Sequence, residues 1–373
     1  MTVSGAGRFG FDAVLVLSYG GPRGPEDVLP FMRNATRGRG IPDERLVEVS
    51  GHYQLFGGRS PINERNQELL DGLSAALAER GVEVPIVIGN RNWTPYVHET
   101  LAELAASGAR RVLILATAAY SSYSGCRQYR EDLAAALERV GGAASGMEFT
   151  KVGPFAETDG FVTANADAVR AALAELPGAR VVFVTHSIPT AMDAVSGPES
   201  PGGLRENTYS VQHRRVAEAV AAGVGLADGE WEIAYCSRSG APHIPWLEPD
   251  VNDRLGELAA AGVPSVVTVP FGFINDHMEV VYDLDTQARE TAAEHGLAYV
   301  RAATVGVHPA FVGMLADAVV GASVPTDPLP GPAADPARST LGGLRTCSAT
   351  CCGSGRPERP GVAALPAACG APV

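Results

Sequence analysis

Cysteine, basic residues and long apolar runs are all scarce in this 373-residue chain. It has six cysteines, and 29 basic against 42 acidic residues leave a net charge of −13. An acidic surface repels polyanions, so nucleic acids and anionic membranes are not expected as partners. No apolar run approaches the roughly 18 residues of a membrane helix, and the N-terminus has no signal-peptide core. We therefore expect a cytoplasmic protein without integral membrane association, whose clustered cysteines are metal ligands or bystanders rather than disulfides.

Three common active-site signatures are absent as well. Gly20-Gly21-Pro22 follows an apolar run, but it matches neither the GxGxxG nor the GxxxxGK[ST] pattern of phosphate-binding loops. No GxSxG nucleophile elbow is present, so Ser187 is not expected to act as a nucleophile. A nucleotide-dependent enzyme and a serine hydrolase are therefore both disfavoured.

The chain does contain an alternation of short apolar runs with longer amphipathic segments. Nearly continuous apolar runs suit parallel strands that are buried on both faces, and the segments between them suit helices. The expected strands are residues 13–18, 84–89, 111–117, 181–186, 233–236, 265–270 and 298–302. This pattern predicts an α/β protein with parallel sheets flanked by helices, and so many strands fit two sheets better than one.

The same pattern divides the chain into parts. We expect a first domain over residues 8–160 and a second over residues 161–307. A helix over residues 308–321 is expected to complete the first domain. Residues 322–373 are rich in proline, alanine and glycine and show little periodicity, which predicts a tail rather than core.

Polar side chains follow several of the expected strands. Ligands of open α/β sheets bind beyond the carboxyl ends of the strands. Tyr19 follows the strand over residues 13–18, His186 ends the strand over residues 181–186, and His277 lies shortly after the strand over residues 265–270. A histidine at a strand end can accept a proton or bind a metal ion at neutral pH. The alternative is a buried histidine that hydrogen-bonds a neighbouring loop.

An acidic segment, NDHMEVVYDLD, continues from His277. We expect Asp276 to cap a helix there and to share one face with Glu279 and Asp283. The opposite, core-facing stripe would consist of Val281, Leu284 and Ala288. Such a row of carboxylates indicates a path for a divalent cation or for protons, and the alternative is a solvated helix start that complements the dipole.

Six segments carry a wider pattern in one fixed order. They are LVLSYGGPRGPEDVLPFMRN, HYQLFGGRSPINERNQ, GNRNWTPY, VTHSIPTAM, SRSGAPHIPWLEPDV and PFGFINDHMEVVYDLD. Together they resemble the ferrochelatase family over residues 11–315, in particular its actinobacterial type that metallates coproporphyrin III. A single motif is weak, but six in register are specific. The resemblance implies two Rossmann-like domains in the class II chelatase fold, with a porphyrin cleft between them.

The resemblance also implies a reaction and residue roles. The chain would insert Fe²⁺, as a substrate, into coproporphyrin III to give coprohaem for haem b biosynthesis, and we expect it to be a monomer. His186 resembles the histidine that takes the pyrrole protons, Glu279 its carboxylate partner at the incoming iron, and Asp283 a metal relay behind it. The residues implied to contact the porphyrin are Tyr19, Ser60 and Tyr129.

Alternatives remain open for the substrate and for catalysis. Protoporphyrin IX is an alternative substrate, although residues 22–55 lack the apolar lip of enzymes that take it. Arginines in this segment would attract propionates or be ordinary surface residues; they are Arg33, Arg37 and Arg39. His52 stands where some relatives carry a basic residue. Cobalt insertion into sirohydrochlorin is a rival on the same fold, and a non-catalytic haem or porphyrin carrier is a rival of another class.

Three cysteines gather near the end of the chain, at Cys347, Cys351 and Cys352. Some ferrochelatases hold a [2Fe–2S] cluster with three C-terminal cysteines and one in the position of Cys126. The resemblance thus implies these four as ligands, which is the usual thiolate complement of such a cluster. Zinc is a chemical alternative, and Cys369 is an alternative for one of the ligands. We expect a stabilising or sensing role for the metal rather than a catalytic one.

Overall fold

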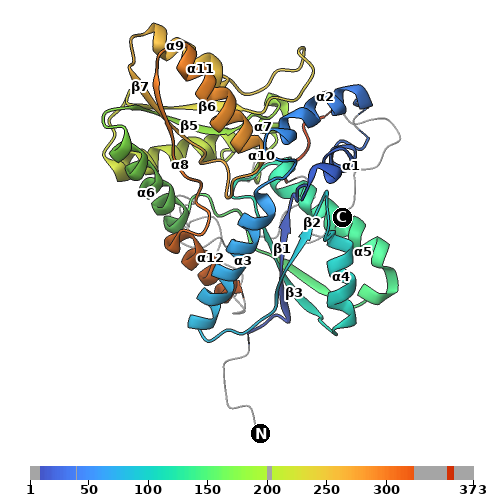
Figure 1. Ribbon diagram of the computed structural model, residues 1–373. Helices are drawn as coiled ribbons and strands as arrows, with labels where there is room; N and C mark the ends of the chain where they lie inside the picture. The colour runs from blue at the N-terminus through green and yellow to red at the C-terminus, as the bar shows by residue number, and fades with distance from the viewer. Residues whose placement is uncertain (1–8, 39, 200–203, 323–350, 357–373) are drawn as a thin grey trace.

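The computed structural model describes residues 9–38, 40–199, 204–322 and 351–356. It contains two four-stranded parallel sheets (Figure 1). The first has the order β2-β1-β3-β4 and consists of β1 (Ala13–Ser18), β2 (Ile86–Asn90), β3 (Arg111–Ala116) and β4 (Glu148–Lys151). The second has the order β6-β5-β7-β8 and consists of β5 (Arg180–His186), β6 (Trp231–Cys236), β7 (Ser265–Val269) and β8 (Ala298–Arg301). The predicted α/β class with two parallel, helix-flanked sheets is confirmed.

Helices occupy most of the connections between strands. Those before β5 are α1 (Pro25–Ala35), α2 (Asp43–Gln54), α3 (Ile62–Glu79), α4 (Val97–Ala106), the π-helix η1 (Tyr123–Arg127), α5 (Gln128–Val140), the 3₁₀-helix η2 (Gly141–Ala144) and α6 (Asp159–Glu175). Those after β5 are α7 (Thr190–Ala194), α8 (Tyr209–Val224), α9 (Val251–Ala260), α10 (Met278–Val280), the π-helix η3 (Val281–Ala288), α11 (Arg289–Glu294) and α12 (Pro309–Ala322). None of the helices in the described ranges is long and apolar enough to cross a bilayer.

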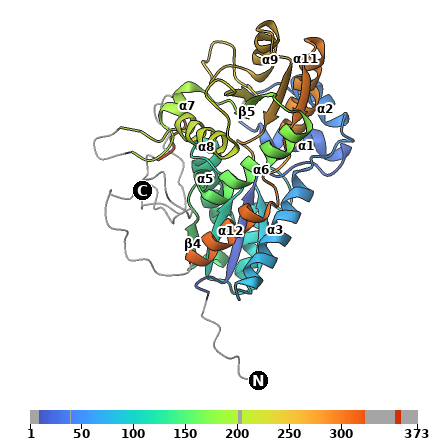
Figure 2. The same ribbon diagram turned by 90° about the vertical axis from the view of Figure 1, so that its left-hand side faces the viewer.

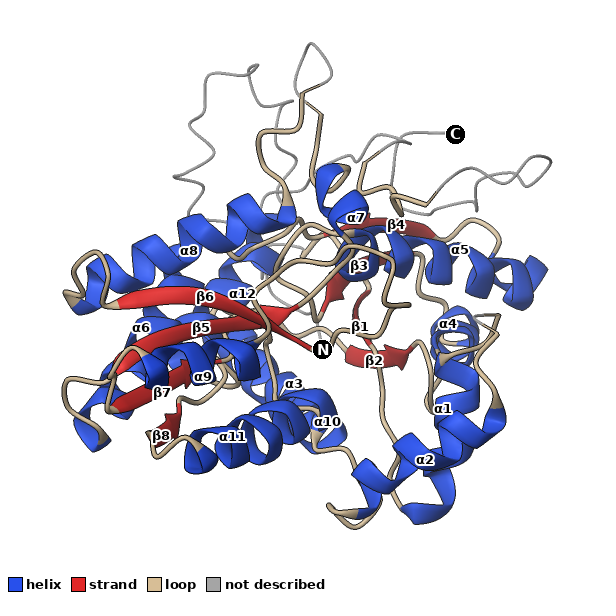
Figure 3. Cartoon of the chain, turned by 90° about the horizontal axis from the view of Figure 1, so that it is seen from above, coloured by secondary structure: helices blue, strands red, loops and turns tan. Residues whose placement is uncertain are grey.

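Both faces of each sheet are buried, which explains the apolar runs. Side chains alternate between the faces of a strand, so Val14 and Val16 of β1 pack on the side of α3 while Leu15 packs with α4 and α5. In the second sheet Val181 packs with α6 and α8, and Val182 packs with α9 and η3. Figure 3 shows α8 on one side of this sheet and α9 and α11 on the other.

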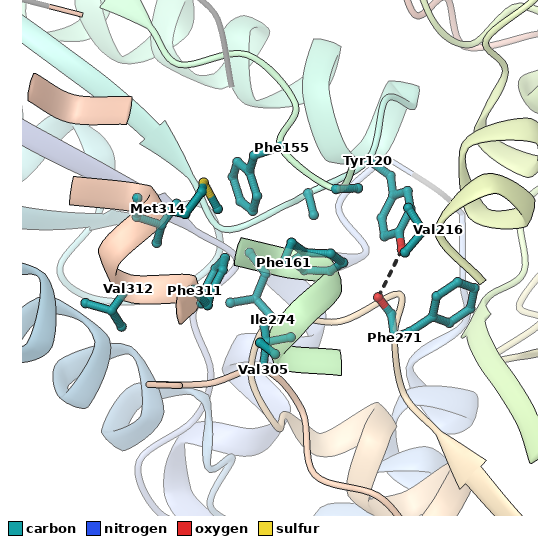
Figure 4. Packing of buried hydrophobic residues seen from close by; sticks show 14 of the residues in the cluster. Tyr120, Phe155, Phe161, Val216, Phe271, Ile274, Val305, Phe311, Val312 and Met314 are labelled. Carbon is teal, nitrogen blue, oxygen red and sulfur yellow. Dashed lines mark hydrogen bonds between the residues drawn. The ribbon is translucent and has the colours of Figure 1, made fainter. Parts of the chain in front are cut away.

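One hydrophobic cluster joins the two sheets. It includes Val14 of β1 and Phe183 of β5, together with Phe161 of α6 and Phe311 of α12. Close packing of aromatic rings is visible in Figure 4, where the Tyr120 hydroxyl also donates to the Phe271 carbonyl at 3.3 Å. The cluster runs without a break through both halves of the chain.

The helix α12 matches its predicted bounds closely. The sequence predicts a helix over residues 308–321, and α12 begins at Pro309 and ends at Ala322. It packs against α3 and α6 (Figure 2), and an ion pair of 2.6 Å joins Arg80 after α3 to Asp317.

Two strands of the first sheet differ from the expectation. The strand expected from residue 84 begins at Ile86, because Pro85 has no N–H to donate to a ladder. The strand β4 has no counterpart among the expected strands, since its sequence EFTK is polar and it pairs only with β3 at the edge of the sheet.

Candidate active site

His186 ends β5 at the carboxyl edge of the second sheet. Its side chain is 31% exposed, and its Nδ1 lies 2.5 Å from the carbonyl oxygen of Ser187. A carbonyl can only accept a hydrogen bond, so Nδ1 carries the proton and the lone pair resides on Nε2. The backbone therefore holds His186 in the tautomer in which Nε2 is a base.

Glu279 faces that lone pair from α10. Its Oε2 lies 3.8 Å from His186 Nε2 and 3.9 Å from His277 Nδ1, and its side chain is 51% exposed. The fold thus brings together the histidine and the carboxylate that the sequence singles out. His277, whose side chain is 23% exposed, is a third member of this group; desolvation lowers its pKa, the charge of Glu279 raises it and His186 lowers it.

The expected row of three carboxylates is wrong for Asp276. The helix cap is His277, in an extended conformation and without a side-chain cap bond, and Asp276 turns away to pair with Arg301. The expected core stripe also shifts, because η3 is a π-helix with a wider turn, so the fully buried valine is Val280 rather than Val281. Leu284 and Ala288 are buried as expected.

Asp283 lies behind Glu279 and is buried. It accepts a hydrogen bond from the Ser237 hydroxyl on the loop after β6. The pKa of Asp283 is raised to about 6, chiefly by burial; the Ser237 hydrogen bond and His186 lower this pKa, and the charge of Glu279 raises it. A carboxyl group that changes charge near neutral pH, next to Glu279 and His186, can pass on a cation or a proton.

A buried network holds the backbone of His186. The Tyr209 hydroxyl donates to the His186 carbonyl at 2.9 Å and lies 2.7 Å from Thr185 Oγ1. His213 Nε2 is 2.8 Å from the same Thr185 oxygen, and its ring stacks on Tyr120 at 3.5 Å between centroids. Burial lowers the pKa of His213 to about 3, so it stays neutral in the folded protein.

Tyrosines from the first half of the chain complete the surroundings. Tyr19, after β1, is 37% exposed and meets Phe31 edge to face at 6.1 Å. Tyr53 of α2 also meets Phe31 edge to face, at 6.1 Å between centroids, and the pKa of Tyr53 is raised by burial first and then by the charges of Glu279 and Tyr19. Tyr53 therefore lies near both groups, although the sequence pattern HYQLFGG drew attention only to His52. His52 itself stacks on Tyr282 of η3 at 3.9 Å.

Ser60 is buried beside the glycine turn that follows Tyr19. Its N–H donates to the Pro22 carbonyl at 3.0 Å, and a β-carbon on Gly21 would lie 2.7 Å from the Ser60 β-carbon. The serine lines a cavity of about 230 Å³ together with Arg23, Arg59, Asn63, Glu64 and Gln67. This volume is below the range of roughly 300 to 1,000 Å³ that is usual for small-molecule sites.

Tyr129 is buried in the first half of the chain. Its hydroxyl hydrogen-bonds Thr117 just beyond β3, and the Arg91 guanidinium lies 4.5 Å above its ring. Arg91 also forms an ion pair with Asp132. Of the arginines expected to attract propionates, Arg33 pairs with Asp43 and Arg37 donates to Asn34, whereas Arg39 lies outside the described residues.

Three of the four expected cluster ligands are in contact with one another. Cys126 of η1 packs with Cys351 and Cys352 in a buried group of its own, and the sulfur atoms of the last two are 3.7 Å apart. Hydrogen bonds to Cys126 and Cys351, together with burial, raise the pKa of the Cys352 thiol. Cys347 and Cys369 lie outside the described residues. Among the described residues no group of three or more His, Cys, Asp or Glu side chains is arranged so that it could hold a metal ion.

Comparison with known proteins gives a consistent picture. The family model described as Ferrochelatase matches residues 11–322. The coproporphyrin III ferrochelatase of Streptomyces coelicolor is 52% identical over 83% of this chain and 85% of its own length. That of Propionibacterium freudenreichii is 46% identical over 95% of this chain and 99% of its own length. Among solved structures, SirB from Bacillus subtilis with Fe³⁺ gives a TM-score of 0.44 at 14% identity, covering 83% of this chain and 92% of that one. The matched segment includes every element from β1 to α12, and the chain belongs to the ferrochelatase family.

Proposed function

We propose that this chain inserts Fe²⁺ into coproporphyrin III to form coprohaem for haem b biosynthesis. The observation that carries the proposal is the pair of His186 Nε2 and Glu279 Oε2, 3.8 Å apart at the carboxyl edge of the second sheet. In the reaction one Fe²⁺ enters the ring and two N–H protons leave it, so iron keeps its oxidation state. The names of the relatives supply the choice of porphyrin.

The chemistry matches the residue types. His186 is the base, because its Nδ1–H is engaged by the Ser187 carbonyl and its Nε2 can take a pyrrole proton. Glu279 holds the incoming Fe²⁺, since a hard oxygen ligand can bind the ion and release it again. Asp283 is the relay behind it. A cleft that binds the macrocycle bent, with one pyrrole lone pair tilted toward the metal, would contribute on the order of a few kcal/mol to catalysis.

The porphyrin would lie between the two halves of the chain. Tyr19 would contact the face of the ring opposite His186, and the exposure of its phenol supports this role. Ser60 and the arginines of its cavity, Arg23 and Arg59, are suited to the propionates. Tyr129 is assigned to the same substrate through its hydroxyl, which hydrogen-bonds Thr117 just after the carboxyl end of β3. Residues 8–160 and 161–307 are the proposed domains on either side of this cleft.

One experiment separates this function from its rivals. Apoprotein is supplied anaerobically with Fe²⁺ and either coproporphyrin III or protoporphyrin IX, and the metalloporphyrin spectrum is followed. We expect insertion into coproporphyrin III well above the uncatalysed rate and slower insertion into protoporphyrin IX. A carrier would bind the porphyrin without accelerating insertion, and the opposite preference would reassign the substrate.

We further propose a [2Fe–2S] cluster held by Cys126, Cys347, Cys351 and Cys352. Two thiolates bound to one tetrahedral metal at about 2.3 Å lie about 3.8 Å apart, close to the 3.7 Å between the sulfurs of Cys351 and Cys352. Bound there, the group would fasten the C-terminal segment to η1 rather than take part in insertion. Iron and acid-labile sulfide measured after anaerobic purification test this assignment, and a colourless protein that contains neither contradicts it. We also propose that the enzyme is cytoplasmic and monomeric.

A further inference from the structure

Four carboxylates lie close together in the chain between residues 276 and 285, and the structure sorts them into two pairs. Glu279 and Asp283 are the pair near His186. Asp276 and Asp285 both form ion pairs with Arg301, the last residue of β8. The sequence alone offers no reason to separate these pairs.

Arg301 binds both of its carboxylates through two hydrogen bonds each. Toward Asp276, Nη1 reaches Oδ1 at 3.0 Å and Nη2 reaches Oδ2 at 3.1 Å. Toward Asp285, Nε reaches Oδ1 at 2.7 Å and Nη2 reaches Oδ2 at 2.9 Å. The Arg301 side chain is only 14% exposed, and the Thr304 hydroxyl adds a bond of 3.2 Å to Asp276. Only the planar fork of an arginine can make both bidentate contacts at once.

Asp276 and Asp285 lie before and after the residues that are proposed to bind iron, Glu279 and Asp283, in the sequence. Asp276 directly precedes His277, whose ring lies 3.9 Å from Glu279. Asp285 follows Asp283 by two residues within η3. The guanidinium therefore fixes both ends of the segment that presents Glu279 and Asp283, and its hydrogen bonds occupy the oxygens of two carboxylates that would otherwise compete for a cation.

We propose that Arg301 is a positioning residue for iron delivery, which holds the segment from Asp276 to Asp285 so that Glu279 and Asp283 alone face His186. This inference rests on the proposed function. Arg301 itself touches neither substrate nor metal in this role, so its effect is expected on the use of Fe²⁺ rather than on the binding of porphyrin.

The test is Arg301→Gln in the full chain, with kcat and KM measured separately for Fe²⁺ and for coproporphyrin III. We expect KM for Fe²⁺ to rise about tenfold or more, since small displacements of positioned groups have effects up to about 10²-fold, while KM for the porphyrin changes less than about twofold. Arg301→Lys should not restore the wild-type value, because an ammonium group cannot hold both carboxylates. Asp285→Ala, which removes both hydrogen bonds from Arg301 to Asp285, should shift KM for Fe²⁺ in the same direction by less, and it can be measured if Arg301→Gln folds poorly.

Arg254→Gln is the matched control. Arg254 also joins two carboxylates, Glu232 and Glu257, but on the α9 side of the sheet. It should lower thermal stability without changing KM for Fe²⁺. An unchanged KM for Fe²⁺ in Arg301→Gln, an equal rise in both KM values, or the same effect in Arg254→Gln would overturn the inference. Absence of turnover in the wild-type protein would instead count against the proposed function.

Discussion

Gly355 lies directly against the backbone of Ala191 in α7. A β-carbon on Gly355 would be 2.4 Å from the carbonyl carbon of Ala191, and Gly355 has a φ of +65°. The segment 351–356, which contains Cys351 and Cys352, therefore packs directly against α7. This helix begins at Thr190, four residues after His186.

Gly355→Ala should detach this segment. An alanine in the left-handed region costs roughly 1 to 2 kcal/mol, and here its β-carbon also meets backbone that cannot move aside cheaply. We expect a fall in bound iron and acid-labile sulfide and a lower melting temperature. Gly353→Ala is the control, because its β-carbon would make only an ordinary contact of 3.6 Å with Val195. Equal behaviour of the two variants would contradict the docking of this segment.

His186→Ala should abolish insertion and preserve porphyrin binding. The variant removes the Nε2 lone pair that faces Glu279, and loss of a general base lowers rates by about 10²- to 10⁴-fold. Turnover is followed from the metalloporphyrin spectrum, and binding from the quenching of porphyrin fluorescence. His98→Ala, on α4, serves as the control with normal turnover expected. Near-normal insertion by His186→Ala would remove His186 from the mechanism.

His213 should make the protein less stable in mild acid. Burial lowers its pKa from 6.5 to about 3, so between these values the unfolded chain binds a proton that the folded chain does not. The free energy of unfolding contributed by this residue therefore falls as pH falls below about 6.5, by about 1.4 kcal/mol per pH unit. His213→Gln, which does not titrate, should show a correspondingly weaker pH dependence in urea unfolding between pH 7 and 5. Parallel curves for the two proteins would refute this.

Phe311→Ala should destabilise the whole molecule. Phe311 is fully buried, with ring centroids 5.8 Å from Phe155 and 5.9 Å from Phe161, and such truncations cost about 3 to 5 kcal/mol. Phe311→Leu should cost less, since it keeps most of the volume. Because the core is shared, calorimetry should show one transition moving to lower temperature in both variants. Two separate transitions, only one of which moves, would mean that the sheets unfold independently.

The sequence predicts those parts of the site that rest on local pattern. His186 ends a continuous apolar run that is typical of a buried strand, and Glu279 lies within a long family motif. The sequence therefore identifies both residues and predicts that they act together. The position of Asp276 is predicted wrongly, because its partner Arg301 is 25 residues further along the chain and ends an ordinary apolar run. The π-helical turn of η3 leaves no sequence signal either, so the sequence predicts Val281 rather than Val280 on the core-facing side. Tyr53 could have been found through its place beside His52 in a family motif, but only the fold brings it near Glu279.

The shared core also sets an order of events during synthesis. Val14 and Val16 of β1 lie in the same cluster as Phe311 and Leu315 of α12, near opposite ends of the described chain. While the ribosome is still making residues 309–322, the apolar faces of α3 and α6 that pack against α12 have no cover. The nascent chain must therefore wait for α12, and a ferrochelatase stalled or cut before this helix would leave these apolar faces exposed to chaperones and proteases.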